Sequence, residues 1–136
     1  MATKPIGKVV DQAATLLQKL VRMKAADKDG MCQCVTCGKR AHWKEMQGGH
    51  YISRTYSRWK LCEENINPQC VGCNCFSNKS IDNYFHYMVD MYGYDHVKYM
   101  TDVKREIVKW NRAELMEMIA DLKGRIKDQE SRLGLV

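Results

Sequence analysis

Proline is scarce in this 136-residue sequence, and long apolar runs are missing from it. Two prolines and nine glycines exclude a collagen-like chain or a proline-rich linker. No apolar run approaches the ~20 residues of a membrane-spanning helix, so we expect no membrane partner. The first residues, MATKPIGKVVDQ, hold no apolar stretch of a signal peptide. We therefore expect a single domain over 1–136, located in the cytoplasm.

Acidic residues are outnumbered by basic ones, 16 against 22, which gives a formal net charge of +6. Such an excess suggests an anionic partner, although a net charge alone is a weak signal. The seven cysteines are an odd number for a set of disulfides. Without a secretory signal they favour a metal site in a reducing compartment.

Apolar residues at helical spacing predict helices at both ends of the chain. Residues 6–28 are predicted as an amphipathic N-terminal helix, with Val10 and Leu17 on its apolar face. Residues 94–136 are predicted as a C-terminal helical region, in which Asn111 caps the last helix. The apolar stripe of that helix could pair with a second copy of the chain or pack on the first helix of its own chain.

The middle part of the chain, residues 31–92, contains all seven cysteines. Short extended pieces are expected at Ala41–Glu45, His50–Arg54 and Trp59–Cys62. A helical face follows them, and Gly93 is a suitable residue to end that helix.

Four of the cysteines form two C-x2-C knuckles, Cys34/Cys37 and Cys70/Cys73. Each knuckle can turn both of its sulfurs toward one metal, and four thiolates in two such pairs are typical of a tetrahedral Zn²⁺ site. We therefore predict a structural Zn²⁺. The remaining cysteines are predicted to be packing residues or free thiols: Cys32, Cys62 and Cys75.

Between and after the knuckles lie His50, in GGHY, Asn65, in NINPQC, and Asn74, directly after the last zinc cysteine. This order resembles that of HNH, or ββα-metal, nucleases with a zinc clasp. In such chemistry a neutral imidazole deprotonates water, so His50 is the predicted general base. Asn65 is predicted to brace the loop and orient His50. Asn74 is predicted to help hold a catalytic Mg²⁺ or Mn²⁺.

Each of these residues has a simpler interpretation when taken singly, such as a surface histidine or an asparagine that caps a turn. Taken together and in order, they favour the nuclease. The predicted fold is α+β: a small zinc-clasped ββα-metal (HNH) core over 31–92, flanked by an N-terminal helix and C-terminal helices.

Nearly the whole sequence resembles the phage NinG/Rap family of recombination proteins, and more distantly the endonuclease VII type of junction-resolving enzyme. The resemblance is carried by CVTCG, GGHYISR and ENINPQCVGCN, and by Lys79-Ser80 and Asn83-Tyr84 before YG. It implies a structure-selective, metal-dependent DNA endonuclease. The substrates would be branched recombination intermediates such as Holliday junctions and D-loops, in the cytoplasm of the host cell if a phage encodes the protein.

The sequence also departs from these patterns. Gly49 stands where many HNH enzymes have a metal-binding Asp or His, and Ser77 stands where endonuclease VII enzymes have a Glu. The second protein ligand of the catalytic metal therefore stays open among Glu45, Glu64, Asn67 and Asn78. Two alternatives remain: a non-catalytic zinc-stabilised accessory protein that binds branched DNA and recruits host recombination proteins, and an adaptor that binds only protein.

Basic and aromatic residues alternate around the histidine, most densely in RTYSRWK. Basic side chains there can neutralise phosphates, and an aromatic ring could stack on an unpaired base or instead pack in the core. The predicted DNA contacts are Arg40, Lys44, Arg54, Tyr56, Arg58, Trp59 and Lys60. Because a four-way junction needs two symmetric cuts, a homodimer is the favoured assembly.

Overall fold

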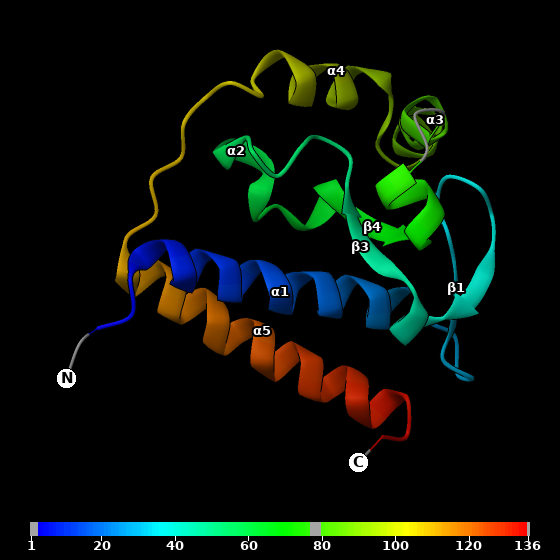
Figure 1. The fold of residues 1–136 in the computed structure, drawn as a ribbon, viewed down its shortest axis with the longest axis horizontal. Coiled ribbons are helices and arrows are strands. Elements are labelled where there is room, and N and C mark those ends of the chain that lie inside the picture. The colour runs from blue at the N-terminus through cyan, green and yellow to red at the C-terminus, as the bar shows by residue number, and fades with distance from the viewer. Residues whose placement is uncertain (1–2, 77–79, 136) are drawn as a thin grey trace.

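The computed structural model describes residues 3–76 and 80–135, and it shows a mixed fold of helices and two small sheets (Figure 1). The helices and strands are α1 (Ile6–Ala25), β1 (Met31–Gln33), β2 (Arg40–His42), β3 (Gln47–His50), α2 (Ser57–Lys60), β4 (Ile66–Gln69), α3 (Ser80–Tyr92), α4 (Tyr94–Asp102) and α5 (Arg112–Arg132). Short 3₁₀ turns lie at Trp43–Glu45 and Glu63–Asn65, and a π-helical segment lies at Gly72–Phe76.

The first helix, α1, begins just after Pro5 and buries one apolar face. It ends at Ala25, three residues before the predicted end. The reason is local, because the Asp27 carboxylate accepts hydrogen bonds from the backbone N–H groups of Asp29 and Met31. That turn draws the backbone out of the helix, and Gly30 completes it with φ of +81°.

The last helix, α5, packs along α1 within the same chain (Figure 1). Its predicted cap is confirmed, since Asn111 Oδ1 accepts from the Glu114 N–H at 2.8 Å. At the other end of the pair, Arg132 donates to the carbonyl of Met23 at 2.8 Å. The buried stripe of α5 is Leu115, Ile119, Leu122 and Ile126. This stripe packs within the chain, so it gives the predicted homodimer no support.

Both sheets are antiparallel and two-stranded, β1 with β2 and β3 with β4. All three predicted extended pieces are wrong in part or whole. The piece predicted at Ala41–Glu45 is a strand only as far as His42, because Trp43–Glu45 forms a 3₁₀ turn. The strand β3 ends at His50, where His50–Arg54 was expected to continue, and Trp59 lies in the helical turn α2. The backbone N–H and carbonyl of Ile52 bond the side chain of Asn65 rather than a neighbouring strand, and the strand pairing ends before this residue.

The β3–β4 pair lies between α1 on one face and α3 on the other (Figure 1). On the α3 side, the Tyr84 hydroxyl donates to the Gly49 carbonyl at 2.7 Å. On the α1 side, Gly48 lies so close to Gln18 that a β-carbon at position 48 would come within 3.0 Å of the Gln18 backbone. The strand that ends at His50 is therefore held from both faces.

None of the helices in the described ranges combines the length and the hydropathy that a bilayer crossing requires.

Candidate active site and metal centre

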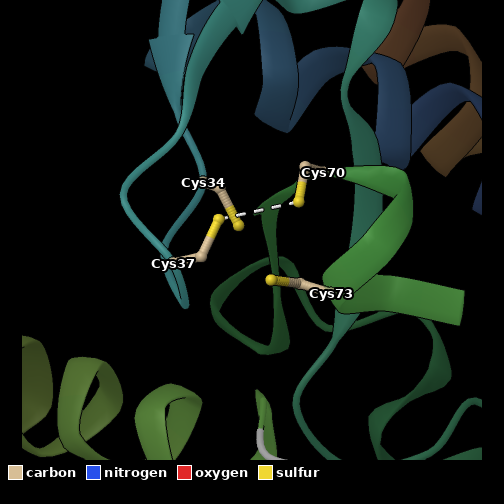
Figure 2. Close-up of side chains that lie close together, drawn as sticks. All are labelled: Cys34, Cys37, Cys70 and Cys73. Atoms are coloured by element: carbon tan, nitrogen blue, oxygen red, sulfur yellow. Dashed lines mark hydrogen bonds between the residues drawn. The ribbon is translucent and has the colours of Figure 1, made fainter. Parts of the chain in front are cut away.

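The four predicted zinc cysteines, Cys34, Cys37, Cys70 and Cys73, point their sulfurs at one another (Figure 2). All four Sγ atoms lie within 4.8 Å of one another, and Cys37 Sγ lies 3.7 Å from Cys70 Sγ. A tetrahedral Zn²⁺ with Zn–S bonds of about 2.3 Å separates its sulfurs by about 3.8 Å. The cluster therefore has the dimensions of a structural zinc site, and its all-sulfur donor set suits Zn²⁺.

The two knuckles come from different sheets, which gives the cluster a structural role. The first follows β1, and Gly38 closes it with φ of +80°. The second follows β4 directly. The Val35 N–H of the first knuckle donates to the Pro68 carbonyl of β4 at 3.0 Å. A metal held by all four sulfurs would join the β1–β2 sheet to the β3–β4 pair.

Crowding of the four thiols separates their acidities. Burial by itself would raise the pKa of Cys34, but the Thr36 hydroxyl at 3.2 Å and nearby backbone N–H groups outweigh it and lower the pKa to about 6. Burial and the neighbouring sulfurs raise the pKa of Cys73 to about 12. Four thiolates this close repel one another, so a cation is needed to keep all of them ionised together.

The other three cysteines stay outside this cluster among the described residues. Burial raises the pKa of Cys32 and of Cys62, which keeps both thiols protonated and unreactive at neutral pH. Cys75 is exposed, and its Sγ lies 3.4 Å from Gln47 Oε1.

His50, the predicted base, closes β3 opposite Ile66 of β4. Its Nε2 lies 3.1 Å from the backbone carbonyl of Lys60. Because a carbonyl can only accept, this contact assigns the proton to Nε2 and leaves Nδ1 as the basic nitrogen. Burial lowers the pKa of His50, and the charges of Arg54 and Lys60 lower it further against the opposing Lys60 carbonyl. The imidazole is therefore neutral at pH 7.

Asn65 is fully buried and bonds the loop that follows His50. Its Oδ1 accepts from the Ile52 N–H at 2.9 Å, and its Nδ2 donates to the carbonyls of Ile52 at 2.9 Å and Trp59 at 3.2 Å. Its own carbonyl accepts from the Tyr51 N–H at 2.8 Å. These bonds hold the backbone of the two residues after the histidine, Tyr51 and Ile52, and that of Trp59. Asn65 forms no direct bond with the imidazole.

A cavity of about 600 Å³ brings His50 and Asn74 together. The Asn74 amide Nδ2 donates to Gln47 Oε1 at 2.6 Å, which leaves the Asn74 Oδ1 as the atom suited to a hard cation. Several residues of this cavity were missed by sequence reasoning: Gln18 and Arg22 of α1, Gln47 and Ser53. The one sequence signal for this contact was Gly48, because the absence of a β-carbon there allows α1 to pack closely on β3.

The candidates for a second metal ligand that the structure describes lie outside this cavity. Glu45, Glu64 and Asn67 do not line the cavity of His50 and Asn74, and Ser77 and Asn78 lie outside the described residues. Glu64 Oε1 contacts His96 Nε2 at 3.0 Å, while Asn67 Nδ2 donates to the Tyr84 hydroxyl at 3.1 Å.

The departure at Gly49 has a steric reason. A β-carbon at this position would overlap the buried side chain of Gln69, with Gln69 Cδ only 2.6 Å away. The space that a larger side chain at position 49 would need is therefore filled by the side chain of Gln69 on the neighbouring strand. Only a residue without a β-carbon fits at position 49 while Gln69 keeps this position.

Of the predicted DNA contacts, Arg54 lines two cavities together with His50, and Lys60 lines one of them. Arg54 forms no hydrogen bond or ion pair with the rest of the described chain. Lys60 Nζ is paired with Asp11 at 3.0 Å, and Arg40 with Asp27 at 2.9 Å. Tyr56 is half-buried.

The prediction of Trp59 as a DNA contact is corrected, because the residue is only 1% exposed and packs with Tyr84, Met88 and other residues of α3 and α4. It therefore cannot stack on a base in this structure. Arg58 lies over its ring at 4.2 Å, and Lys44 lies 5.8 Å from the ring of Trp43. Trp59 is therefore a buried core residue rather than a DNA contact.

Comparison with known proteins places the chain in a family. Neither a curated protein nor a solved structure shows a significant match. The family model described as "Bacteriophage Lambda NinG protein" matches residues 1–132, which is nearly the whole chain and includes both cysteine knuckles, His50, Asn65 and Asn74. The chain therefore belongs to the family of the bacteriophage lambda NinG protein.

Proposed function

We propose that the protein is a metal-dependent, structure-selective DNA endonuclease that hydrolyses phosphodiesters in branched recombination intermediates, such as Holliday junctions and D-loops. Membership of the NinG family implies a phage recombination-related protein. The observation that carries the proposal is the shared cavity of His50 and Asn74, which the cationic side chain of Arg54 borders. Branched double-stranded DNA is then the partner, in the host cytoplasm.

The order of elements supports an HNH, or ββα-metal, core. β3, β4 and α3 occur in this order along the chain, with the short helix α2 between the two strands and His50 at the end of the first strand. Asn74 lies just after the second strand, in the segment that leads toward α3. We assign this core to residues 31–92 of a single domain over 1–136, with the zinc cluster holding its two sheets together.

In the proposed reaction, His50 Nδ1 takes a proton from a water molecule as the water oxygen attacks phosphorus. The phosphorus–oxygen bond to the leaving sugar oxygen breaks, and that oxygen takes up a proton from solvent. The Lys60 carbonyl stabilises the imidazolium formed, because it accepts a hydrogen bond from the Nε2–H. A Mg²⁺ or Mn²⁺ beside Asn74 would supply positive charge for the phosphate and the leaving oxygen.

Arg54 and Asn65 support this step without taking part in the proton transfer. The Arg54 side chain reaches the cavity of His50 and is free to bind a phosphate. Asn65 holds the backbone of Ile52, two residues after His50, and so keeps the imidazole aimed into the cavity.

The test compares His50→Ala with His86→Ala, since His86 is exposed on α3 and outside the cavity. We expect His50→Ala to abolish cleavage of a synthetic four-way junction and to keep its affinity for that junction. His86→Ala should cut at the wild-type rate. Cleavage by His50→Ala at an undiminished rate would exclude His50 as the base.

The lack of a metal-binding residue next to the histidine favours a second candidate function, that of a non-catalytic accessory protein. Gly49 offers no ligand, and the described alternatives lie outside the cavity. A non-catalytic zinc-stabilised accessory protein would bind branched DNA and recruit host recombination proteins. It would bind junctions without any cleavage that depends on Mg²⁺ or Mn²⁺.

A further inference from the structure

We propose that a second cavity, next to that of His50, binds an unpaired nucleotide of the branched DNA beside the phosphate that is cut. This inference rests on the proposed endonuclease function and adds the means of selecting branched over linear DNA. The cavity, of about 500 Å³, lies between the start of α1, the loop before α2 and the segment that leads into α5.

The walls of this cavity are apolar and held in place. Val10, Val108 and Trp110 line it, with Ile6 at the start of α1. The Val108 N–H donates to Ser57 Oγ at 2.9 Å, which ties the segment before α5 to the start of α2. Trp110 packs on the buried cluster between α1 and α5, so its ring has a fixed position. A fixed aromatic ring beside aliphatic side chains is a suitable surface for a nucleobase.

The rim of the same cavity is cationic. Arg54, Lys60 and Lys109 line it, and no Asp or Glu among the described residues does. Lys60 is paired with Asp11, whereas Arg54 and Lys109 have neither an ion pair nor a hydrogen bond to any other residue that the structure describes. An apolar floor under such cations matches a nucleotide, which has an apolar base and an anionic phosphate.

The cavity also shares lining residues with the cavities that contain His50. Arg54 lines both this cavity and the one shared by His50 and Asn74. Thr55 and Lys60 line it together with another space of about 470 Å³ that contains His50. A base seated against Trp110 and a phosphate held beside His50 would therefore belong to neighbouring positions of one strand. A base that is already unpaired enters at less cost than one in a duplex.

The test uses two matched substitutions, Ile6→Glu and Ile107→Glu. Both isoleucines are exposed, by 42% and 78%, and both changes add one negative charge. Only Ile6 lines the cavity. An acidic residue in the first turn of α1 suits the helix dipole, so Ile6→Glu should fold. Both are made in the His50→Ala chain, so that binding is measured without cleavage.

The DNA probes are a duplex with one unpaired 2-aminopurine and the same duplex fully paired. We expect Ile6→Glu to reduce the preference for the unpaired probe by about 5- to 100-fold, the size of one base–aromatic stacking contact. Ile107→Glu should weaken the binding of both probes equally and so keep the preference for the unpaired one. Bound 2-aminopurine should be quenched by the wild-type ring and regain fluorescence with Trp110→Leu.

Three outcomes would overturn the inference. The first is an equal preference for the unpaired probe in the two glutamate variants, and the second is unchanged 2-aminopurine fluorescence with Trp110→Leu. The third is an altered oligomeric state of Ile6→Glu with unchanged DNA preference, which would mean that a second copy of the chain occupies the cavity. If, in any of these cases, the wild-type chain cleaves branched DNA and His50→Ala does not, the proposed function stands and only the nucleotide site fails. Absence of cleavage and binding on every DNA would reject the proposed function itself.

Discussion

Asn65 bonds both backbone polar groups of Ile52, accepting from its N–H and donating to its carbonyl, each at 2.9 Å. Asn65→Ala would leave these buried groups without partners, so we expect a loss of about 2–4 kcal/mol in the free energy of unfolding. Asn83→Ala is the matched control, because Asn83 is exposed on α3, and it should change stability by less than about 0.5 kcal/mol. Urea denaturation measures both, and equal stability of the two variants would contradict a bracing role.

Gly48, two residues before the histidine, is predicted to resist substitution for a steric reason. A β-carbon at Gly48 would meet the Gln18 Cβ at 2.7 Å and its backbone Cα at 3.0 Å, so Gly48→Ala should destabilise the fold by about 1–3 kcal/mol. Gly124 of α5 has nothing within 4 Å of the position that a β-carbon would take, so Gly124→Ala should stabilise by about 0.5–1 kcal/mol. The two thermal midpoints should therefore shift in opposite directions, and a shift of the same sign would refute the close approach of α1.

Zinc content separates ligand from bystander cysteines. Cys37 and Cys75 are both exposed, but only Cys37 belongs to the four-sulfur cluster. We expect elemental analysis to find one Zn²⁺ per chain in the wild type and in Cys75→Ser, and less than one in Cys37→Ser. Cys37→Ser should also unfold at a lower temperature, because the metal joins the two sheets. Full zinc occupancy in Cys37→Ser would show that the cluster is not the metal site.

The pH dependence of cleavage follows from the environment of His50. Burial, with the charges of Arg54 and Lys60, lowers its pKa below the usual value of about 6.5. The base acts in its neutral form, so the rate should rise with pH and reach its plateau below the pH expected for an unperturbed histidine. Arg54→Gln removes one of the lowering charges and should move the midpoint of the acidic limb upward. Single-turnover cleavage measures the midpoint, and a wild-type value above 6.5 would disagree with the geometry.

Local features of the site could be predicted from the sequence. Knuckle spacing alone identified the four sulfurs, since two residues between cysteines suffice to turn both toward one metal. The Asn111 cap was equally local, because its partner Glu114 lies three residues away. Such features depend on short stretches of chain and little on tertiary packing.

The rest of the site depends on contacts between distant segments. Gln18 and Arg22 line the cavity of His50 only because α1 packs across Gly48. Trp59 was predicted as a DNA contact because it stands among basic residues, yet α3 and α4 cover it. The strands have three or four residues each, too short for alternation to mark them against neighbouring turns.

Metal-dependent cleavage of synthetic DNA tests the central proposal most directly. A four-way junction, a three-way junction and a linear duplex of the same sequences would be incubated with the wild-type chain, with and without added Mg²⁺ or Mn²⁺. We predict cleavage of the branched substrates only with the metal, and much slower cleavage of the linear duplex. Tight binding of the junction without cleavage under any metal condition would contradict the endonuclease and support the accessory protein instead.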